Sequence, residues 1–386
     1  MFNCSLPSAF KRALTALFLM SNAVVVQAEQ TAEDWSDVVQ EARGSTVFFY
    51  AWGGSNSVNQ YLRWAGRHLN RQYGINLRHV KVGDIAEAVH RLRSDQAAGR
   101  EQGGAIDLLW INGENFHALK ESKLLEPELL SAIPNHVHLL TDELPLLTDF
   151  GVPVDGFEVP WGMGQFNIIA RDGSFAEPAI TPEQLLAYAE QNPGRLSYPK
   201  PPDFIGTTFL KSLLQALADN DQRLYREPSR SAERDLLPVL WDYLDQLHPL
   251  LWEKGEAFPQ DSAQQLQWLA DGQLHAAFSF NPQEMDSKVR NGRLPETVTQ
   301  HYFAQGAITN SHYLAVPHNA SHKAAAKVVI NFLISRSAQA RKADPRYWGD
   351  PAVVRLDEAE ALLPTAEELH AGWQERLEAH WLARYQ

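Results

Sequence analysis

The sequence of 386 residues has little of what several classes of protein need. It has a single cysteine, Cys4, which excludes an intrachain disulfide framework and a cysteine-rich metal site. Lys and Arg number 34 against 47 Asp and Glu, so the net charge is −13 and a nucleic-acid-binding function is disfavoured. After residue 28, no stretch reaches the roughly 18 uncharged apolar residues of a membrane-spanning helix. We therefore expect a soluble mature protein of two or three domains.

The first 28 residues have the pattern of a secretory signal peptide. A mostly apolar run over residues 13–26 follows Lys11 and Arg12, and a cleavage site follows Ala28. A buried N-terminal helix is the alternative. Cleavage removes Cys4, which precedes the apolar run and so is not placed for lipid attachment. We expect a periplasmic protein that has no lipid anchor and is stabilised by its cores.

The mature chain alternates short apolar strands with amphipathic helices. Residues 46–52, 75–82 and 105–111 are rich in β-branched and other apolar side chains, which predicts buried strands. Each of these segments is followed by a breaker and by apolar residues at helical spacing. This alternation favours parallel pairing in an α/β sheet with right-handed crossovers.

A second unit of the same kind follows an interruption at residues 153–161. Strands are predicted at residues 165–170 and 276–280. Near the C-terminus, Thr365–Glu368 fits a capping box, which predicts that a last helix begins there. Apolar residues recur every four positions from residue 369 to residue 381, and we interpret them as a packing face rather than a partner site.

Three loops of small or polar residues open predicted helices. They are residues 52–56, 110–114 and 198–208. The first turn of a helix has free backbone N–H groups, and ligands of open α/β sheets bind beyond the carboxyl ends of the strands. Ordinary capped turns are the alternative. Tryptophan ends two of the strands, and Trp161 lies in a crossing segment, so these rings are candidates for an aromatic wall against a flat or cationic group as well as for core packing.

The order of several segments resembles that of the type 2 extracellular solute-binding proteins of ABC importers. The matching segments are Val47–Gly53, Ile106–Trp110, Val159–Gly162, Phe166–Ala170, Leu196–Pro202, Gly272–Ala277 and Ala320–Ala326. Together they span nearly the whole mature chain. The Tyr-Pro-x-Pro stretch from Tyr198 is similar to the thiamine, iron and polyamine branch of that family. The adjacent Tyr-Tyr pair of some iron-binding members is missing, which weakens the iron interpretation.

The resemblance implies an α/β fold of two lobes, the periplasmic-binding-protein type 2 fold, with a ligand cleft between the lobes. Lobe one would comprise residues 29–163 and 306–340, lobe two residues 164–305, and residues 341–386 would form C-terminal helices that pack on the lobes. Closure around the ligand would follow hinge bending. The hinge candidates lie around Gly162–Gly164 and Gln305–Gly306, where ordinary turns are the alternative. The implied partners are a small solute and membrane permease subunits, with no cofactor, no nucleic acid and a monomeric chain.

The resemblance also implies which side chains face the cleft. From lobe one they are Trp52, Ser55, Asn56, Trp110 and Asn112, to which the aromatic argument adds Trp161. From lobe two they are Tyr198, Asp203, Thr207, Thr208, Ser279 and Asn281. Asn310 and Tyr313 lie near the return crossing.

The ligand class stays open at this stage. Asp203 lies in an aromatic and proline-rich loop, which suits an organic cation unless the carboxylate caps the helix or faces solvent. The sequence Gly206-Thr207-Thr208 offers hydroxyls and N–H groups to an anion. A phosphate ester of thiamine type would satisfy both features, and a polyamine is a further candidate.

Three rival functions remain. Residues 53–57 begin like the nucleophile elbow G-x-S-x-G but end in Ser57, so an exported serine hydrolase using Ser55 is one alternative. An oxyanion- or metal-binding transport protein is another, because histidines occur at positions 136 and 138 and at 312, 318 and 322. No H-E-x-x-H motif accompanies them, and the alternative is that they are polar surface residues without a metal. A structural interaction protein is the third.

Overall fold

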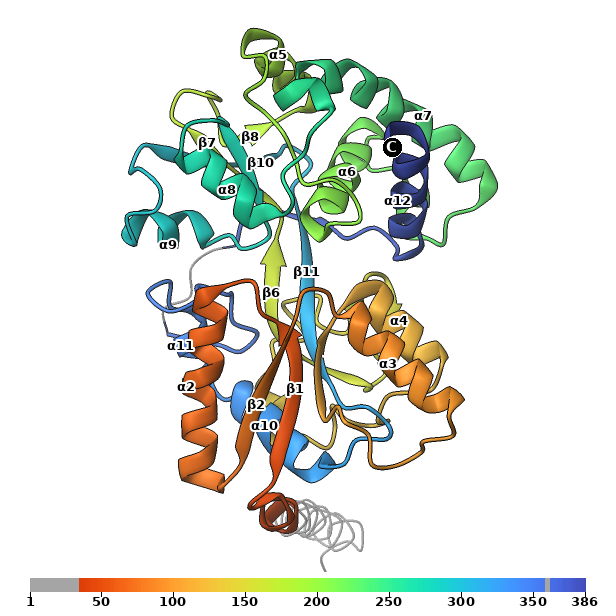
Figure 1. Cartoon of the computed structure of the whole chain (residues 1–386), viewed down its shortest axis with the longest axis vertical. Helices are drawn as coiled ribbons and strands as arrows, with labels where there is room; N and C mark the ends of the chain where they lie inside the picture. Colours follow the sequence, from red (N-terminus) through yellow and green to blue (C-terminus); the bar gives the residue numbers. More distant parts are fainter. Residues whose placement is uncertain (1–34, 358–361) are drawn as a thin grey trace, which may run out of the picture.

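The chain folds as two α/β lobes stacked along the long axis of the molecule and joined by long strands (Figure 1). The computed structural model describes residues 35–357 and 362–386, so the predicted signal peptide lies outside the described residues. The connecting strands are β6 (Glu158–Gln165) and β11 (Ala307–Ala315), which pair antiparallel. The predicted two-lobe α/β fold is therefore confirmed.

The sheet of lobe one contains the strands that were predicted near the start of the mature chain. Its order is β12-β11-β3-β1-β2, and β6 pairs with β11. The bounds are β1 (Thr46–Trp52), β2 (Asn76–Val82), β3 (Leu108–Ile111) and β12 (Thr365–Glu367). β1 pairs in parallel with both β2 and β3. The carboxyl ends of β1 and β3 therefore lie at one edge of the sheet, which faces lobe two (Figure 1).

Helices cover both faces of this sheet. On one face lie α2 (Asn56–Tyr73), α10 (Lys323–Leu333) and α11 (Arg336–Ala343), and on the other lie α3 (Ala86–Ala97) and α4 (Gly113–Glu121). The first core contains Phe49 and Trp161, and the second contains Phe116, all fully buried. A short 3-10 helix, η1 (Pro134–His138), and the hairpin β4 (Thr148–Asp149) with β5 (Val152–Pro153) complete the lobe.

Lobe two has a smaller sheet with helices packed on it. The strand order is β8 (Ala179–Ile180), β10 (Val298–Phe303), β7 (Asn167–Arg171) and β9 (Ala276–Ser279). Its helices are α5 (Pro182–Gln191), α6 (Phe204–Leu217), α7 (Arg230–Leu247), α8 (Ser262–Ala270) and α9 (Glu284–Arg290), with 3-10 turns η2 (Gln222–Tyr225), η3 (His248–Leu250) and η4 (Trp252–Gly255). The strand predicted at residues 165–170 is divided between β6 and β7, because the chain passes at Phe166 from one sheet to the other.

The C-terminal segment returns to both lobes, and one prediction about it is wrong. Residues Thr365–Glu367 form β12 rather than the first turn of a helix, because their backbone pairs in parallel with the edge of β11. The last helix, α12 (Gly372–Tyr385), begins later. Its predicted packing face is confirmed, since Trp373 and Trp381 are fully buried in the lobe-two core. Sheet pairing over three residues here outweighs a local capping signal.

Glycines on β6 permit close packing where the chain crosses between the lobes. A Cβ on Gly162 would lie 2.0 Å from Nε2 of His312 and 2.1 Å from Oδ2 of Asp350, and one on Gly164 would lie 2.2 Å from the ring of Phe280. Both glycines lie inside a fully buried strand, so the ordinary-turn interpretation of this stretch is wrong. Their role as a hinge stays a prediction.

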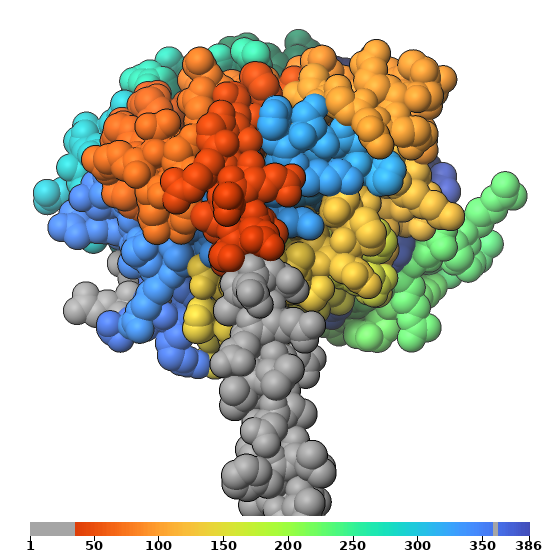
Figure 2. Space-filling model, turned by 90° about the horizontal axis from the view of Figure 1, so that it is seen from below, coloured from red at the N-terminus to blue at the C-terminus, as the bar shows by residue number. Residues whose placement is uncertain are grey.

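The far end of lobe one is also the end of the molecule away from lobe two. Figure 2 shows it from below, where early residues in red and orange lie beside the blue segment near residue 320, and Gly104 there forms a bridge with Ala320. A surface hollow of about 460 Å³ lies on this segment, lined in part by Glu101, His318 and Lys323. It therefore lies away from the lobe junction. No helix in the described ranges is long and apolar enough to cross a membrane.

Candidate functional site

The candidate site is the lobe junction, where the carboxyl ends of β1 and β3 face lobe two (Figure 1). From lobe one it receives the start of α2 and the start of α4, and from lobe two the start of α6 and the loop after β9. Among the contacts that cross the junction, Nδ2 of Asn281 donates to the carbonyl of Trp348 at 3.5 Å, and a Cβ added at Gly349 would lie 2.8 Å from the Cβ of Gln283. The loop after β9 therefore contacts the segment around residues 348 and 349.

An aromatic cluster forms one side of the junction and comprises Trp110, Trp161, Trp348 and His312. The Trp110 and Trp161 rings meet edge to face at 5.2 Å, and Trp348 lies 5.6 Å and 5.4 Å from them. His312 stacks on Trp348 with an angle of 10° between the rings. Such pairs contribute about 0.5–1.5 kcal/mol each beyond area burial. Trp161 and Trp348 are buried, whereas Trp110 is partly exposed.

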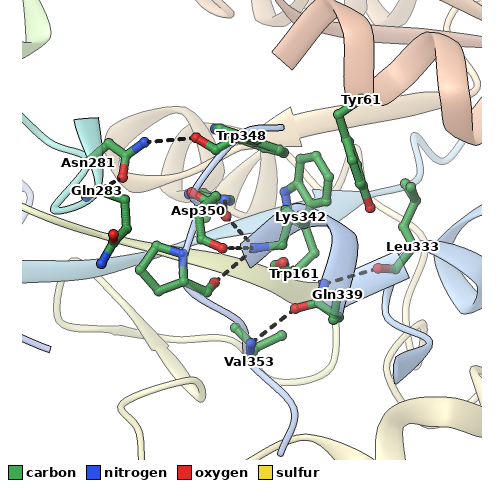
Figure 3. A network of polar contacts seen from close by, with 12 residues as sticks. Tyr61, Trp161, Asn281, Gln283, Leu333, Gln339, Lys342, Trp348, Asp350 and Val353 are labelled. Atoms are coloured by element: carbon green, nitrogen blue, oxygen red, sulfur yellow. Dashed lines mark hydrogen bonds and ion pairs between the residues drawn. The ribbon is translucent and has the colours of Figure 1, made fainter. Parts of the chain in front are cut away.

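A buried charge network lies beside the aromatic cluster, with Nζ of Lys342 5.5 Å from the centre of the Trp348 ring (Figure 3). Nζ of Lys342 is fully buried and donates to the carboxylate of Asp350, to the Asp350 carbonyl at 3.2 Å and to the Pro351 carbonyl at 2.8 Å. His312 Nε2 lies 3.1 Å from the same carboxylate. Burial alone would raise the pKa of Asp350, but the imidazole of His312 and the ammonium of Lys342 lower it. Burial lowers the pKa of Lys342. This network fixes the segment that carries Trp348.

Four carboxylates that influence one another electrostatically, here called the carboxylate cluster, come from elements at the junction: Asp84, Glu114, Asp203 and Glu378. Asp84 precedes α3 and Glu114 lies in the first turn of α4, whereas Glu378 lies on α12. Asp203 caps α6, and its Oδ1 accepts the N–H groups of the second and third helical residues at 2.9 Å and 3.0 Å. Glu378 Oε1 accepts the hydroxyl of Thr207 at 3.0 Å. The cluster thus draws on both lobes.

These carboxylates raise one another's pKa. Burial raises the pKa of Glu114 to about 7, and the charges of Glu378 and Asp84 add to that shift. Burial and then Asp84 raise the pKa of Glu378, and burial, Asp261 and Asp84, in that order, raise the pKa of Asp203. Burial is the largest cause of each shift, and the neighbouring carboxylates act in the same direction. Both causes favour the protonated form of these carboxyl groups.

Lys211 is the cation that acts on the carboxylate cluster, and it already has a partner. Its Nζ is 3.1 Å from Oε1 of Glu368, and both side chains are buried. The ammonium lies 4.5 Å from the ring centre of Phe150, which belongs to lobe one. Asn310 donates to the other oxygen of Glu368 at 3.0 Å. The charge of Lys211 is therefore shared with Glu368 and leaves the cluster only partly compensated.

Several predicted site residues lie at the junction and are at least partly exposed to solvent. Trp52 ends β1 with 42% of its surface exposed, and Asn56 at the start of α2 is exposed. Asn112, at the start of α4, is partly exposed. Ser55 precedes α2, but its hydroxyl makes no cap bond and lies 2.9 Å from that of Ser57. That pairing with another hydroxyl gives Ser55 no general base.

Other predicted site residues lie inside the cores. The hydroxyl of Tyr198 contacts His248 and Trp381 at 2.8 Å, and the hydroxyl of Tyr313 donates to the carbonyl of Thr148 at 2.8 Å. Trp161 is fully buried as well. As the structure places them, these three residues have packing roles.

The polar residues predicted near α6 and β9 are bonded within the protein. Thr208 donates to the Phe204 carbonyl at 2.7 Å, and Thr207 to Glu378. Ser279 donates to the carboxylate of Glu284 and accepts from the backbone N–H of Asn281. The donors that an anion would need at this place are therefore already used. In the part of the chain that the structure describes, no three His, Cys, Asp or Glu side chains are grouped so that they could hold a metal ion.

Sequence reasoning missed Asp84, Glu378, Trp348 and the pair Lys342–Asp350. Glu114 lay within a loop singled out from the sequence, but only its asparagine and tryptophan were predicted to face the ligand. Acidic residues directly after parallel strands were the signal available for Asp84 and Glu114. Glu378 and Trp348 come from distant segments that only the fold brings here.

Comparisons with known proteins agree on one family and one fold. The family model described as bacterial extracellular solute-binding protein matches residues 64–355. The chain is 43% identical to Protein YnjB of Escherichia coli (strain K12) over 367 residues, covering 92% of this chain and 94% of that protein.

Solved structures resemble the chain in fold at low identity. The substrate-binding protein of an ABC transporter from Agrobacterium tumefaciens has a TM-score of 0.63 at 13% identity, covering 89% of this chain and 94% of that one. The periplasmic binding protein AfuA from Actinobacillus pleuropneumoniae, with fructose-6-phosphate bound, has a TM-score of 0.62 at 12% identity, covering 88% and 98%. At such identities the likeness concerns the fold.

Proposed function

The chain belongs to the bacterial extracellular solute-binding protein family, as its segment order predicted, and from that premise we propose that it captures a small organic cation between its lobes. Solute-binding components of ABC transporters bind small ligands and work with membrane permease subunits. This chain would release its solute unchanged to such a permease after the lobes open about β6 and β11. The observation that carries the proposal is the carboxylate cluster, to which both lobes contribute.

The site favours a cation over an oxyanion. The start of α6 was the candidate anion site, but its free N–H groups are taken by the carboxylate of Asp203. The hydroxyls of Thr207 and Thr208 are also donated within the protein. An anion would have to displace these bonds and approach a negative potential. A polyamine therefore fits the site better than a phosphate ester of thiamine type, although AfuA, a structural neighbour, binds a sugar phosphate.

Export and domain organisation complete the proposal. The mature chain would begin after Ala28 and act in the periplasm as a monomer. Lobe one would comprise residues 29–163 and 306–340, and lobe two residues 164–305. Mass spectrometry of the secreted protein should find a chain that begins at Glu29, and a full-length cytoplasmic chain would contradict export.

The test of the function is to identify the solute that accompanies the protein. Mass spectrometry of small molecules released from natively purified protein should find an organic cation, and the same compound should raise the melting temperature. Thiamine esters, polyamines and oxyanions are compared in the same thermal-shift series. An oxyanion that stabilises the protein while the cations do not would contradict the proposed ligand class. Hydrolysis of ester substrates that Ser55→Ala abolishes would instead favour the hydrolase alternative.

A further inference from the structure

The loop that follows β9 has a fixed shape and reaches lobe one. The Ser279 hydroxyl accepts the backbone N–H of Asn281 at 3.0 Å, and Oδ1 of Asn281 accepts that of Gln283 at 2.9 Å. Nδ2 of Asn281 then donates to the carbonyl of Trp348 in lobe one, 3.5 Å away (Figure 3). Because the loop is already ordered by its own bonds, little conformational entropy is lost when it meets the other lobe.

The part of lobe one that the loop meets is equally fixed. Trp348 is 5% exposed and belongs to the core of lobe one. The backbone N–H groups of Gly349 and Asp350 both donate to the carbonyl of Lys342, at 3.0 Å and 3.1 Å. Nζ of Lys342 in turn donates to the carboxylate of Asp350. Both halves of the contact are therefore preformed, so that even a small contact can stabilise one arrangement of the lobes.

Gly349 shows how closely the two halves approach each other. Its φ is +80°, and a Cβ built there would lie 2.8 Å from the Cβ of Gln283 and 3.3 Å from the Cα of Pro345. Gln283 is itself only 9% exposed. A side chain at position 349 would therefore push the loop away from lobe one or strain both halves.

The two halves are anchored on either side of the predicted hinge in β6. Toward lobe one, a Cβ on Gly162 would lie 2.1 Å from Oδ2 of Asp350. Toward lobe two, the backbone N–H of Gln165 donates to the carbonyl of Phe280 at 2.9 Å. A bend of β6 between these two points would therefore change the separation between the loop and the segment that carries Trp348.

From these contacts we infer that the loop Asn281–Gln283 and the segment Trp348–Asp350 form an interlobe latch, which holds the lobes together in the free protein. Every contact of the latch is made between protein atoms, so it acts before a solute arrives. Because the solute binds between lobes that are together, the latched fraction of the protein sets the apparent affinity. The inference concerns the lobe equilibrium of the chain itself, so it goes beyond the proposed ligand class and holds for any solute.

The test measures the distance between the lobes in the free mature chain. Residues 29–386 contain no cysteine, so Asn70→Cys on α2 and Gln267→Cys on α8 give one exposed site on each lobe for nitroxide labels. Pulsed electron paramagnetic resonance then gives the distribution of distances between the labels. We expect a main population at the separation that the structure has, and a distribution without that population would overturn the inference.

Gly349→Ala should force the latch apart, because its Cβ would collide with Gln283. The latched population should fall at least about 5-fold. Gly44→Ala is the matched control, since Gly44 has a φ of +79° and nothing within 4 Å of its Cβ position. It reproduces the backbone strain alone and should leave the distribution unchanged. Adding Gln283→Gly to Gly349→Ala removes the collision and should restore the latched population.

Asn281→Asp tests the latch without a change at position 349. The aspartate keeps the oxygen that accepts the N–H of Gln283, but it replaces the donor to the Trp348 carbonyl with a second acceptor. Losing that hydrogen bond should lower the latched population at least about 2-fold. Thermal unfolding of each free variant shows whether it folds, and this variant decides the inference if Gly349→Ala does not fold.

Each outcome decides the inference. Equal distributions in the wild type, Gly349→Ala and Asn281→Asp would overturn it. An equal shift in Gly44→Ala and Gly349→Ala would also overturn it, because backbone strain rather than the contact would then be the cause. Either result leaves the solute-binding function intact, since the measurement needs no solute. A latched protein that carries no solute and binds none of the thermal-shift series would instead count against the function.

Discussion

The aromatic cluster and the carboxylate cluster lie on two sides of the same junction, and they differ in how completely their buried charges are paired. Beside the aromatic cluster, the charge of Lys342 meets the carboxylate of Asp350 and two carbonyl oxygens, so the ammonium is fully paired. In the carboxylate cluster, Glu114 and Glu378 share one lysine that is already paired elsewhere. The buried charges beside the aromatic cluster are therefore paired, whereas those of the carboxylate cluster are only partly compensated, which is the difference on which its proposed binding role rests.

Lys342→Met should have the largest effect on folding stability, because it removes the ammonium that pairs with the buried Asp350 carboxylate and leaves the His312 imidazole as its neighbour. Removing one member of a buried ion pair costs about 3–5 kcal/mol. Urea denaturation measures the free energy of unfolding. Lys327→Met is the control, since Lys327 is partly exposed and lies 3.9 Å from its acidic partner; it should cost about 1 kcal/mol or less. Equal losses of unfolding free energy in Lys342→Met and Lys327→Met would show that the buried ion pair contributes no more than an exposed one.

The second largest expected effect is a pH dependence of the free energy of unfolding that comes from Glu114 in the carboxylate cluster. Because burial raises the pKa of Glu114 to about 7, the folded protein holds a proton there that the unfolded chain releases near pH 4.5. The contribution is therefore present at pH 5 and is lost as the pH rises through 7. Between pH 5 and pH 8 the wild type should lose about 1–3 kcal/mol relative to Glu114→Gln, a range reduced because the side chain is partly exposed.

The control for this titration lies on the same helix. Glu121 is exposed at the end of α4, so Glu121→Gln should follow the pH profile of the wild type. If the wild type and Glu114→Gln instead had parallel profiles, Glu114 would be an ordinary surface carboxylate. The carboxylate cluster would then lack the potential on which its role depends.

The sequence predicted the parts of the site that local patterns encode. Strand β1 was predicted with the bounds that the structure has, whereas a ligand-facing role for Trp110 and Asp203 stays a prediction. Local patterns could not show that Tyr198 turns into the core, because its partners His248 and Trp381 lie far away in the sequence. The local sequence around a tyrosine does not show whether its side chain is exposed or buried, because burial depends on residues that are distant in the sequence.

The same reason explains what the sequence did not reveal. The apolar stripe of α12 identified its packing face, but the contact of Glu378 with Thr207 depends on α6 lying beside α12. β12 formed because the edge of β11 was open to pairing, a condition outside the capping-box signal. Non-local contacts therefore decided both the charged half of the site and the last strand.

Asp203→Asn should have the smallest effect on stability and so sharpens the contrast. Asparagine caps a helix about as well as aspartate, so the bonds to the backbone N–H groups of Ile205 and Gly206 persist. The loss of charge at the helix start, about 0.3–1 kcal/mol, is offset by relief of repulsion from Asp84 and Asp261. The free energy of unfolding, measured by thermal unfolding, should therefore change by less than about 0.5 kcal/mol in Asp203→Asn. Asp203→Ala lacks the cap and should lower it by about 1 kcal/mol. Equal losses in the two variants would show that the negative charge itself stabilises the fold, as it does at Asp350, and the two sides of the junction would no longer differ in kind.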